Sequence, residues 1–224
     1  MEKFLNIKPK STPPHKTIDT QGRLPREFFT VDVVTLAKNL LNKIIVKKTV
    51  EGEYRFKIVE TEAYKAPDDK ACHAYNNKKT NRTKYFWQIG GCLYVYSIYG
   101  HCCLNITAAT AEEPEAVLIR GLQAINKIDE LKAKRKCKKD FDIANGPGKI
   151  GDALELTLED NGIDLCKSND FYIIDNDNKE EIKIAKSKRI NIDYAEEWKD
   201  KEWRFYIENN KYVSKCPSIS KKKK

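Results

Sequence analysis

The chain has 224 residues, of which 40% are hydrophobic, and this composition suits one moderate domain with a core and a polar surface. Lysine and arginine number 42 against 33 aspartates and glutamates, so the formal net charge of +9 favours a polyanionic partner or an acidic membrane surface. No apolar run approaches the roughly 20 residues that cross a bilayer, and the first residues lack the apolar core of a signal peptide, so we expect a soluble intracellular protein without a membrane role.

Both ends of the chain are rich in lysine and lack hydrophobic periodicity. We predict flexible basic tails at residues 1–23 and 216–224, on either side of a single domain at residues 24–215. Such tails either hold a protein near a polyanion or only keep it in solution, and the sequence leaves both readings open.

The first predicted element is a helix that starts from Thr30 as a candidate cap. Its apolar residues Val33, Ala37, Leu40 and Leu41 follow helical spacing. Residues 43–50 then predict a strand, which a turn at residues 51–52 joins to a second strand at residues 54–64.

The second strand carries Glu60 and Glu62 among β-branched and aromatic residues. Regular alternation would place both carboxylates and Tyr64 on the same side as Phe56 and Ile58. A carboxylate on an apolar face costs free energy unless it is paired or functional. The stretch therefore indicates either a working carboxylate or an ordinary strand rim with surface glutamates.

A second hairpin is predicted at residues 92–109, with its turn at Tyr99 and Gly100. Strand parity places Tyr94 and Tyr96 on one face, and Asn105 lies on the returning strand. The tyrosine at the tip is exposed apolar surface that either meets a partner or packs beneath a neighbouring loop.

A long polar loop at residues 65–84, carrying His73, precedes this hairpin, and a short strand ending at Arg120 follows it. A helix within residues 123–140 runs into a basic stretch that is either solvated or in contact with phosphate. A short helix is predicted at residues 152–156.

Three short strands are predicted after these helices, at residues 171–176, 181–187 and 202–209. The elements together predict an α/β (α+β) fold, a single compact domain around a curved, mostly antiparallel sheet with peripheral helices.

The seven cysteines are odd in number, scattered and without a C-x-x-C pair. This pattern favours free thiols over a zinc site or a disulfide framework. They are Cys72, Cys92, Cys102, Cys103, Cys137, Cys166 and Cys216.

Clustered tyrosines, a carboxylate, a loop histidine and an arginine on a basic protein are compatible with a nucleobase pocket. Two other readings stay open at this point. One is a nucleic-acid-binding module without catalysis, and the other is a nuclease or another hydrolase that uses clustered carboxylates to hold a metal.

Five strings link the chain to a known family: "ETEAY", "LYVYSIYG" followed by "LNIT", "AVLIRGL", "NGPGKIGDAL" and "WRFYI". Their order and spacing, from about Leu24 to Val213, resemble the alkyladenine (3-methyladenine) DNA glycosylase family. The resemblance implies a monomeric DNA-repair enzyme that hydrolyses the N-glycosidic bond of alkylated or deaminated purines flipped out of double-stranded DNA. It also implies that the enzyme uses neither a metal nor another cofactor.

The resemblance assigns the catalytic roles to three positions. Glu62 matches the general base that activates the attacking water, whereas Glu60 does not and is expected to be structural. Arg120 matches the arginine that helps to hold this water. Ile190 matches the residue whose backbone carbonyl also contacts it.

The same resemblance assigns residues that receive the damaged base. Tyr64, His73 and Tyr96 match the residues that enclose the flipped base, and the two tyrosines stack on it. Asn105 matches the residue whose side chain collides with the exocyclic amine of guanine. Tyr99 matches the side chain that wedges into the DNA minor groove.

The chain departs from the family pattern at three positions. Thr83 replaces an asparagine, although Arg82 beside it is retained. His101 replaces a more apolar residue next to the wedge. Asn191 replaces a glycine, and we expect the backbone to keep its shape because asparagine tolerates a positive φ better than most residues.

Overall fold

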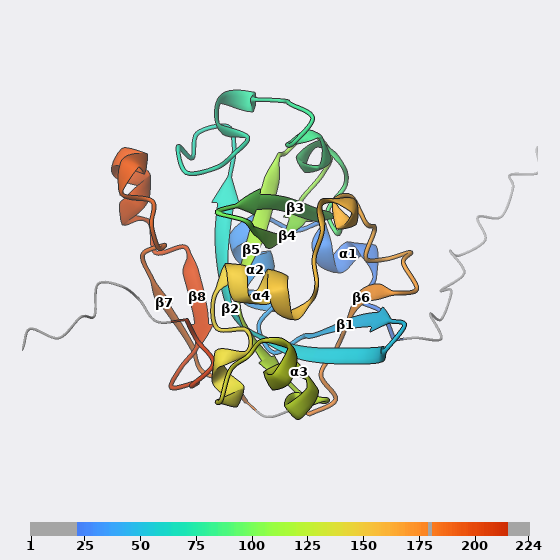
Figure 1. Cartoon of the computed structure of the whole chain (residues 1–224). Helices are drawn as coiled ribbons and strands as arrows, with labels where there is room; N and C mark the ends of the chain where they lie inside the picture. Colours follow the sequence, from blue (N-terminus) through green and yellow to red (C-terminus); the bar gives the residue numbers. More distant parts are fainter. Residues whose placement is uncertain (1–21, 179–180, 215–224) are drawn as a thin grey trace, which may run out of the picture.

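A long central strand, β2 (Gly52–Lys65), organises the fold in the computed structural model of the chain (Figure 1). The structure describes residues 22–178 and 181–214, so the predicted tails lie almost entirely outside the described residues. One edge of β2 pairs with β5 (Glu115–Ala124). Its other edge pairs first with β1 (Ile44–Thr49) and then with β8 (Arg204–Ile207).

The sheet has eight strands in the order β3-β4-β5-β2-β1-β6, with β8 joining β2 to β7. Every pairing is antiparallel, which confirms the predicted α+β class. The remaining strands are β3 (Leu93–Ile98), β4 (His101–Ala108), β6 (Phe171–Ile174) and β7 (Ile184–Ser187). The two predicted hairpins, β1–β2 and β3–β4, both form.

The pairing of β2 with β5 shifts register on both sides of Glu60. Ile58 and Val59 are adjacent, yet both belong to the hydrophobic core. Beyond the shift, the hydroxyl of Thr61 donates to the carbonyl of Ala37 in the helix behind the sheet, at 2.8 Å. The regular alternation assumed from the sequence is therefore wrong here, because a bulge changes the face on which the following side chains lie.

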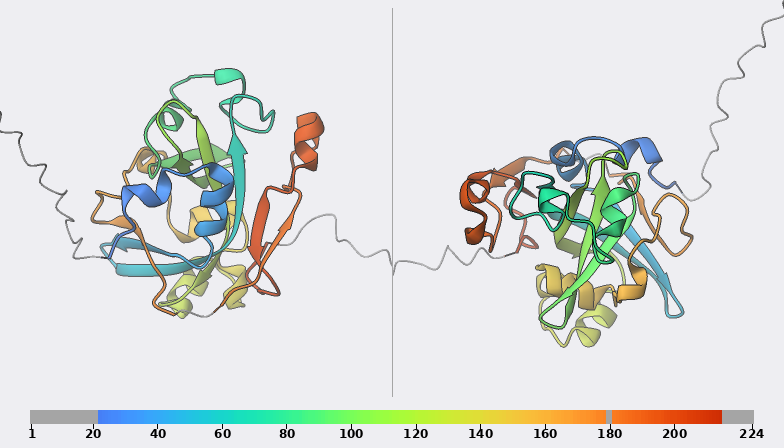
Figure 2. Two further views of the ribbon diagram at one scale, coloured as in Figure 1. Left: turned by 180° about the vertical axis from the view of Figure 1, so that it is seen from behind. Right: turned by 90° about the horizontal axis from the view of Figure 1, so that it is seen from above.

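Two short helices near the N-terminus cover one face of the sheet, seen from behind in Figure 2. They are α1 (Arg26–Phe29) and α2 (Val33–Asn39). The predicted cap was wrong, because Asp32 caps α2 through its carboxylate, which accepts hydrogen bonds from the backbone N–H groups of Val34 and Thr35.

Helices α3 (Ile128–Lys134) and α4 (Pro147–Ala153) lie on the opposite side of the sheet from α2 (Figures 1 and 2). The first is shorter than predicted. The second begins five residues before the predicted start, because Pro147 occupies the first turn, where its fixed φ suits a helix and its missing N–H costs nothing. Short 3-10 turns complete the chain at Tyr75–Asn77, Lys84–Trp87, Asp140–Asp142, Leu158–Asp160 and Asp193–Asp200.

Six of the seven cysteines fall within the described residues and are free, whereas Cys216 lies outside them. No helix in the described parts of the chain is long and apolar enough to cross a membrane.

Close contact between α4 and β4 depends on Gly151. A Cβ atom built on Gly151 would lie 2.0 Å from the carbonyl oxygen of Cys102, which is backbone and cannot rotate away. The glycine therefore lets the helix pack directly on the hairpin that carries the predicted wedge.

Gly151→Ala should lower the free energy of unfolding by about 2 kcal/mol or more, because the added methyl group must push α4 off β4. The matched control is Gly100→Ala, where no heavy atom lies within 4 Å of the added Cβ and only backbone strain, about 1 kcal/mol, is expected. Chemical denaturation measures both. Equal losses in the two variants would contradict the steric explanation.

Candidate functional site

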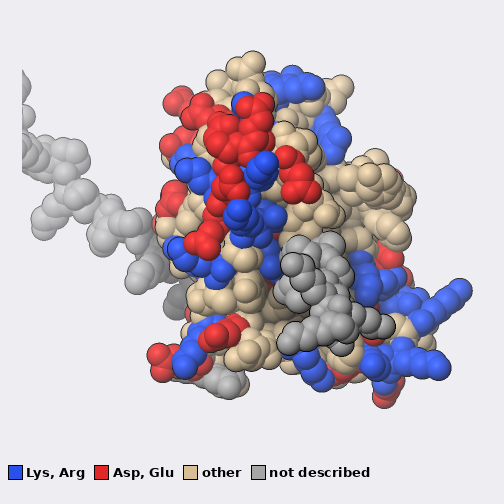
Figure 3. Space-filling model, turned by 90° about the vertical axis from the view of Figure 1, so that its left-hand side faces the viewer, with Lys and Arg blue, Asp and Glu red and all other residues tan. Residues whose placement is uncertain are grey.

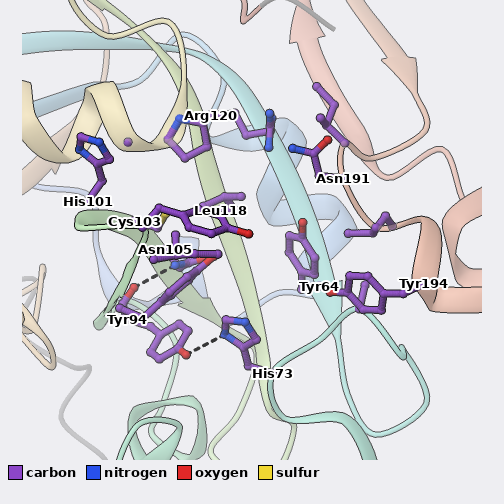
Figure 4. Close-up of a pocket in the computed structure, with 18 of the residues that line it drawn as sticks. Tyr64, His73, Tyr94, His101, Cys103, Asn105, Leu118, Arg120, Asn191 and Tyr194 are labelled. Atoms are coloured by element: carbon purple, nitrogen blue, oxygen red, sulfur yellow. Dashed lines mark hydrogen bonds between the residues drawn. The ribbon is translucent and has the colours of Figure 1, made fainter. Parts of the chain in front are cut away.

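A cavity of about 670 Å³ opens between the β3–β4 hairpin, the loop after β2 and the segment that precedes η5 (Asp193–Asp200) (Figure 4). This volume is within the range of small-molecule sites. Seven of the eight predicted site residues line it: Tyr64, His73, Tyr96, Tyr99, Asn105, Arg120 and Ile190. The eighth, Glu62, lies directly behind this wall, in contact with three of its members.

Glu62 is fully buried and is held by three donors. The hydroxyl of Tyr64 donates to Oε2 at 2.8 Å, and Arg120 Nη1 approaches the same oxygen at 3.4 Å. The backbone N–H of Ile190 donates to Oε1 at 2.8 Å. Ile190 thus reaches the carboxylate through its N–H group, a contact that the sequence did not predict.

Glu60 is also fully buried, but its donors differ. Arg204 Nε and the hydroxyl of Ser214 donate to Oε1 at 2.7 and 2.8 Å, and the backbone N–H of Ser214 donates to Oε2 at 2.6 Å. Arg120 Nε adds a longer contact of 3.3 Å. Neither glutamate lines the cavity, but Glu62 is hydrogen-bonded to three lining residues, whereas Glu60 is hydrogen-bonded to one, Arg120.

Tyr64 stands between the catalytic candidate and the cavity. Burial, together with the adjacent charge of Glu62, raises the pKa of Tyr64 well above its ordinary value of 10.0. The guanidinium of Arg189 lies over the Tyr64 ring, 4.7 Å from its centroid. The phenol is therefore neutral and available as a hydrogen-bond donor to Glu62.

Arg189 is a buried anchor of the site that the sequence did not reveal. Its Nη1 and Nη2 donate to the carboxylate of Asp69 at 2.6 and 2.9 Å, and neither side chain is exposed. This bidentate pair joins the loop after β2 to the segment carrying Ile190. It therefore fixes the backbone N–H that holds Glu62.

His73 lies on the far wall of the cavity, where its Nδ1 is 2.8 Å from the hydroxyl of Tyr94 (Figure 4). Its ring packs edge-on to Tyr96, with centroids 4.6 Å apart. Burial, helped by the charge of Arg82, lowers the pKa of His73 to about 4. The imidazole is thus neutral near pH 7.

Arg82 supports the same wall from behind. Its guanidinium lies 4.7 Å from the centroid of the Tyr96 ring, and its Nε donates to the hydroxyl of Tyr94 at 3.2 Å. Burial raises the pKa of Tyr94 to about 12, so its hydroxyl keeps its proton. Tyr94 itself lines the cavity, whereas Arg82 lies behind the wall, and neither is among the site residues that the resemblance assigned.

Asn105 is buried with its amide oriented by the sheet. It pairs in register with Tyr94 across the β3–β4 hairpin, and its Nδ2 donates to the carbonyl oxygen of Tyr94 at 3.0 Å (Figure 4). This bond fixes the side chain at the cavity wall, so it cannot swing aside without losing a buried hydrogen bond.

Tyr99 occupies the tip of the same hairpin. Its side chain is 94% exposed, and its φ is 50°. A large aromatic ring at that exposure has no packing role within the described chain. The reading in which Tyr99 packs beneath a neighbouring loop is therefore wrong.

The three departures from the family pattern have distinct surroundings. Thr83 is buried, and its hydroxyl donates to the carbonyl of Lys78 at 2.9 Å, which closes the loop locally. Asn191 has φ of 60°, the positive value expected of a residue that replaces glycine. His101 lines the cavity beside the tip, with Nδ1 2.8 Å from Oδ1 of Asp152 in α4.

Tyr194 is a further cavity residue that the sequence did not predict. It projects from η5 near Tyr64 and is 68% exposed (Figure 4). No local sequence pattern predicts this position. Tyr194 reaches the cavity only because the segment near the C-terminal end of the described chain folds back beside the loop after β2.

The face formed by β7, β8 and η5 carries interleaved charges of both signs (Figure 3). Several are paired, as in Lys186–Glu202 at 2.8 Å and Lys188–Asp200 at 2.5 Å. The positive charge of the protein is therefore not concentrated on this face. Within residues 22–178 and 181–214, no group of three or more histidine, cysteine, aspartate or glutamate side chains is placed to hold a metal ion.

The shifted pKa of His73 predicts a specific pH dependence of stability. The folded-state pKa of His73, about 4, lies below the ordinary value of 6.5. Between these two pH values, His73 therefore binds a proton in the unfolded chain but stays neutral in the folded chain. As pH falls from 6.5 to 4, the free energy of unfolding of the wild-type protein should decrease by on the order of 1 to 3 kcal/mol more than that of His73→Asn. Above pH 7 this difference should not change with pH. Denaturant titrations at several pH values measure this; parallel curves for the two proteins would refute it.

The comparisons with known proteins agree with one another. The family model described as Methylpurine-DNA glycosylase (MPG) matches residues 27–211. A relative from Clostridium novyi (strain NT) is 52% identical over 205 residues, which cover 86% of this chain and 98% of the relative. A relative from Borreliella afzelii (strain PKo) is 43% identical over 195 residues, which cover 86% of this chain and all of the relative.

Both relatives carry the provisional name 3-methyladenine DNA glycosylase, as does one from Natranaerobius thermophilus that is 43% identical over 195 residues, covering 86% of this chain and 98% of its own. The family match spans most of the chain and both predicted hairpins. The chain therefore belongs to the methylpurine-DNA glycosylase family, and it is a monofunctional DNA glycosylase, a hydrolase of N-glycosyl bonds.

Proposed function

We propose that this protein excises alkylated or deaminated purines, of the 3-methyladenine and hypoxanthine type, from double-stranded DNA and so initiates base excision repair. The observation that carries the proposal is a fully buried carboxylate, Glu62, held by three donors directly behind an aromatic cavity. A target base inside a duplex cannot reach such a group. The nucleotide must therefore be flipped out of the helix into the cavity.

The chemical step is the attack of a water molecule on the sugar carbon that bears the damaged base. Glu62 acts as the general base, and its charge also stabilises the sugar as it becomes oxocarbenium-like. Arg120 Nη1 lies 3.4 Å from Glu62, longer than the roughly 2.7 to 2.9 Å of a charge-assisted hydrogen bond. This long contact leaves the facing carboxylate oxygen of Glu62 able to accept a further hydrogen bond from a water molecule held beside both side chains.

The tyrosine walls suit the chemistry of the substrate. An alkylated purine is cationic, and the electron-rich faces of Tyr64 and Tyr96 attract a cation more strongly than a neutral base. A cationic base also leaves with little acid assistance. This fits a cavity in which His73, Tyr64 and Tyr94 are all held in their neutral forms.

Selectivity and base eviction are assigned to the second hairpin. Asn105, fixed at the cavity wall by its bond to Tyr94, excludes guanine through conflict with its exocyclic amine. Tyr99, exposed at the tip, enters the minor groove and occupies the place that the flipped nucleotide leaves. Both roles require duplex DNA as the partner, and we propose that a monomer acts on it inside the cell.

A panel of duplex oligonucleotides, each with one lesion and assayed for release of the free base, tests the proposal. Release of hypoxanthine or methylated adenine supports it, whereas tight binding without release from any lesion would favour a DNA-binding module without catalysis. Inhibition by a chelator would favour the metal-dependent hydrolase.

Glu62→Gln should bind lesion DNA and keep its fold, yet excise the base more slowly by on the order of 10² or more, because the amide cannot take a proton from water. Glu115→Gln is the matched control. Glu115 is a buried carboxylate whose partners, Lys65 and the backbone N–H of Val33, lie outside the cavity wall. Single-turnover excision rates and DNA affinity measure the effect. If both variants fold and lose excision to a similar extent, the assignment of Glu62 as the general base is wrong.

Asn105→Ser should admit guanine, so that the ratio of guanine release to hypoxanthine release rises without faster release of hypoxanthine.

Tyr99→Ser should slow excision from stable duplexes more than from mismatched ones, because only stable pairs need the wedge to offset the few kcal/mol that unstacking costs. Base release from matched duplexes containing each base measures both. An unchanged guanine ratio, or equal effects on stable and mismatched pairs, would refute these roles.

A further inference from the structure

Two buried carboxylates, Glu60 and Glu62, share the guanidinium of Arg120. Arg120 Nε lies 3.3 Å from Glu60, and Nη1 lies 3.4 Å from Glu62. Both contacts are longer than a usual charge-assisted bond, so neither carboxylate holds the arginine closely. Because both glutamates are fully buried and Arg120 is 8% exposed, solvent screens this competition little.

The carboxylate of Glu60 is held in place by hydrogen-bond donors that do not line the cavity. Arg204 Nε donates to it at 2.7 Å. Ser214 donates from both its backbone N–H and its hydroxyl, at 2.6 and 2.8 Å. These three short hydrogen bonds hold the carboxylate of Glu60 in place. Its fixed charge therefore attracts Arg120 away from Glu62.

We propose that Glu60 is a positioning residue for base excision: its charge holds Arg120 back from Glu62, so that the carboxylate oxygen facing Arg120 stays available to an attacking water beside both side chains. The inference rests on the proposed role of Glu62 as the general base. Without the charge of Glu60, Arg120 pairs with Glu62 alone. That closer ion pair occupies the carboxylate oxygen that the water needs.

A purely structural role for Glu60 would lie in its pair with Arg204. Removing Glu60 alone leaves Arg204 as an unpaired buried cation, which destabilises the fold whatever happens to catalysis. The double variant Glu60→Gln/Arg204→Met separates the two roles. It removes both charges of the structural pair, yet it leaves Arg120 with Glu62 as its single carboxylate.

The experiment measures single-turnover excision of hypoxanthine, affinity for the same duplex, and the melting temperature. The double variant should fold and bind lesion DNA as the wild type does, but excise about 10-fold to 100-fold more slowly, because a small displacement at the reacting centre has a large effect on rate. An excision rate within about twofold of the wild type in the folded double variant would overturn the proposal.

Glu60→Asp provides a second test that keeps every charge. Its carboxylate recedes from Arg120 by roughly 1.5 Å, one C–C bond, so Arg120 should close on Glu62 and excision should again slow by about 10-fold or more. A wild-type excision rate in this variant would also overturn the proposal. It would mean that a negative charge beside Arg204 is enough for excision, wherever that charge lies relative to Arg120.

Two further variants identify which idea fails. Glu202→Gln breaks a half-exposed ion pair with Lys186 near β8 and should leave excision unchanged. If Glu62→Gln excises as fast as the wild type, the proposed general base is wrong, and the role of Glu60 falls with it. If Glu62→Gln is inactive while the Glu60 variants are fully active, only the positioning role of Glu60 is wrong.

Discussion

The burial of two carboxylates on one strand is the constraint on which the rest of the site depends. Glu60 and Glu62 lie away from water, where an unpaired charge is costly, so the surrounding chain must supply donors to both. Those donors come from β5, from β8, and from the segments before η5 and after β8. The need to satisfy this pair thus draws distant parts of the sequence together behind the cavity.

The cavity itself combines aromatic walls with groups kept in one protonation state. Burial holds Tyr64 and Tyr94 as phenols and His73 as a neutral imidazole. The guanidinium of Arg82 lies over the ring of Tyr96 and that of Arg189 over the ring of Tyr64, and neither arginine lines the cavity. Under the proposed function, this wall stacks on the flipped purine and Glu62 acts as the general base.

Strong local patterns predicted most of the sheet. Alternation and turn residues located both hairpins, and seven of the residues that the family resemblance assigned line one cavity. The local errors have local physical causes. Asp32 outcompetes Thr30 as a cap because its carboxylate accepts two backbone hydrogen bonds, and Pro147 moves the start of α4 forward. The bulge at Glu60 was invisible to the sequence, because register is set by the partner strand.

The sequence by itself determined the strands, the hairpin tip at Tyr99 and the family, since these depend on short-range periodicity and on motifs. Only the tertiary structure decided how the two glutamates differ. In the sequence, Glu60 and Glu62 are two carboxylates separated by a single residue. In the fold, long-range contacts pair Glu60 with Arg204 and Ser214 and pair Glu62 with Ile190, while Tyr64 reaches Glu62 from the same strand. The chemistry of a buried carboxylate is set by its neighbours in space, and those neighbours lie up to 154 positions away along the chain.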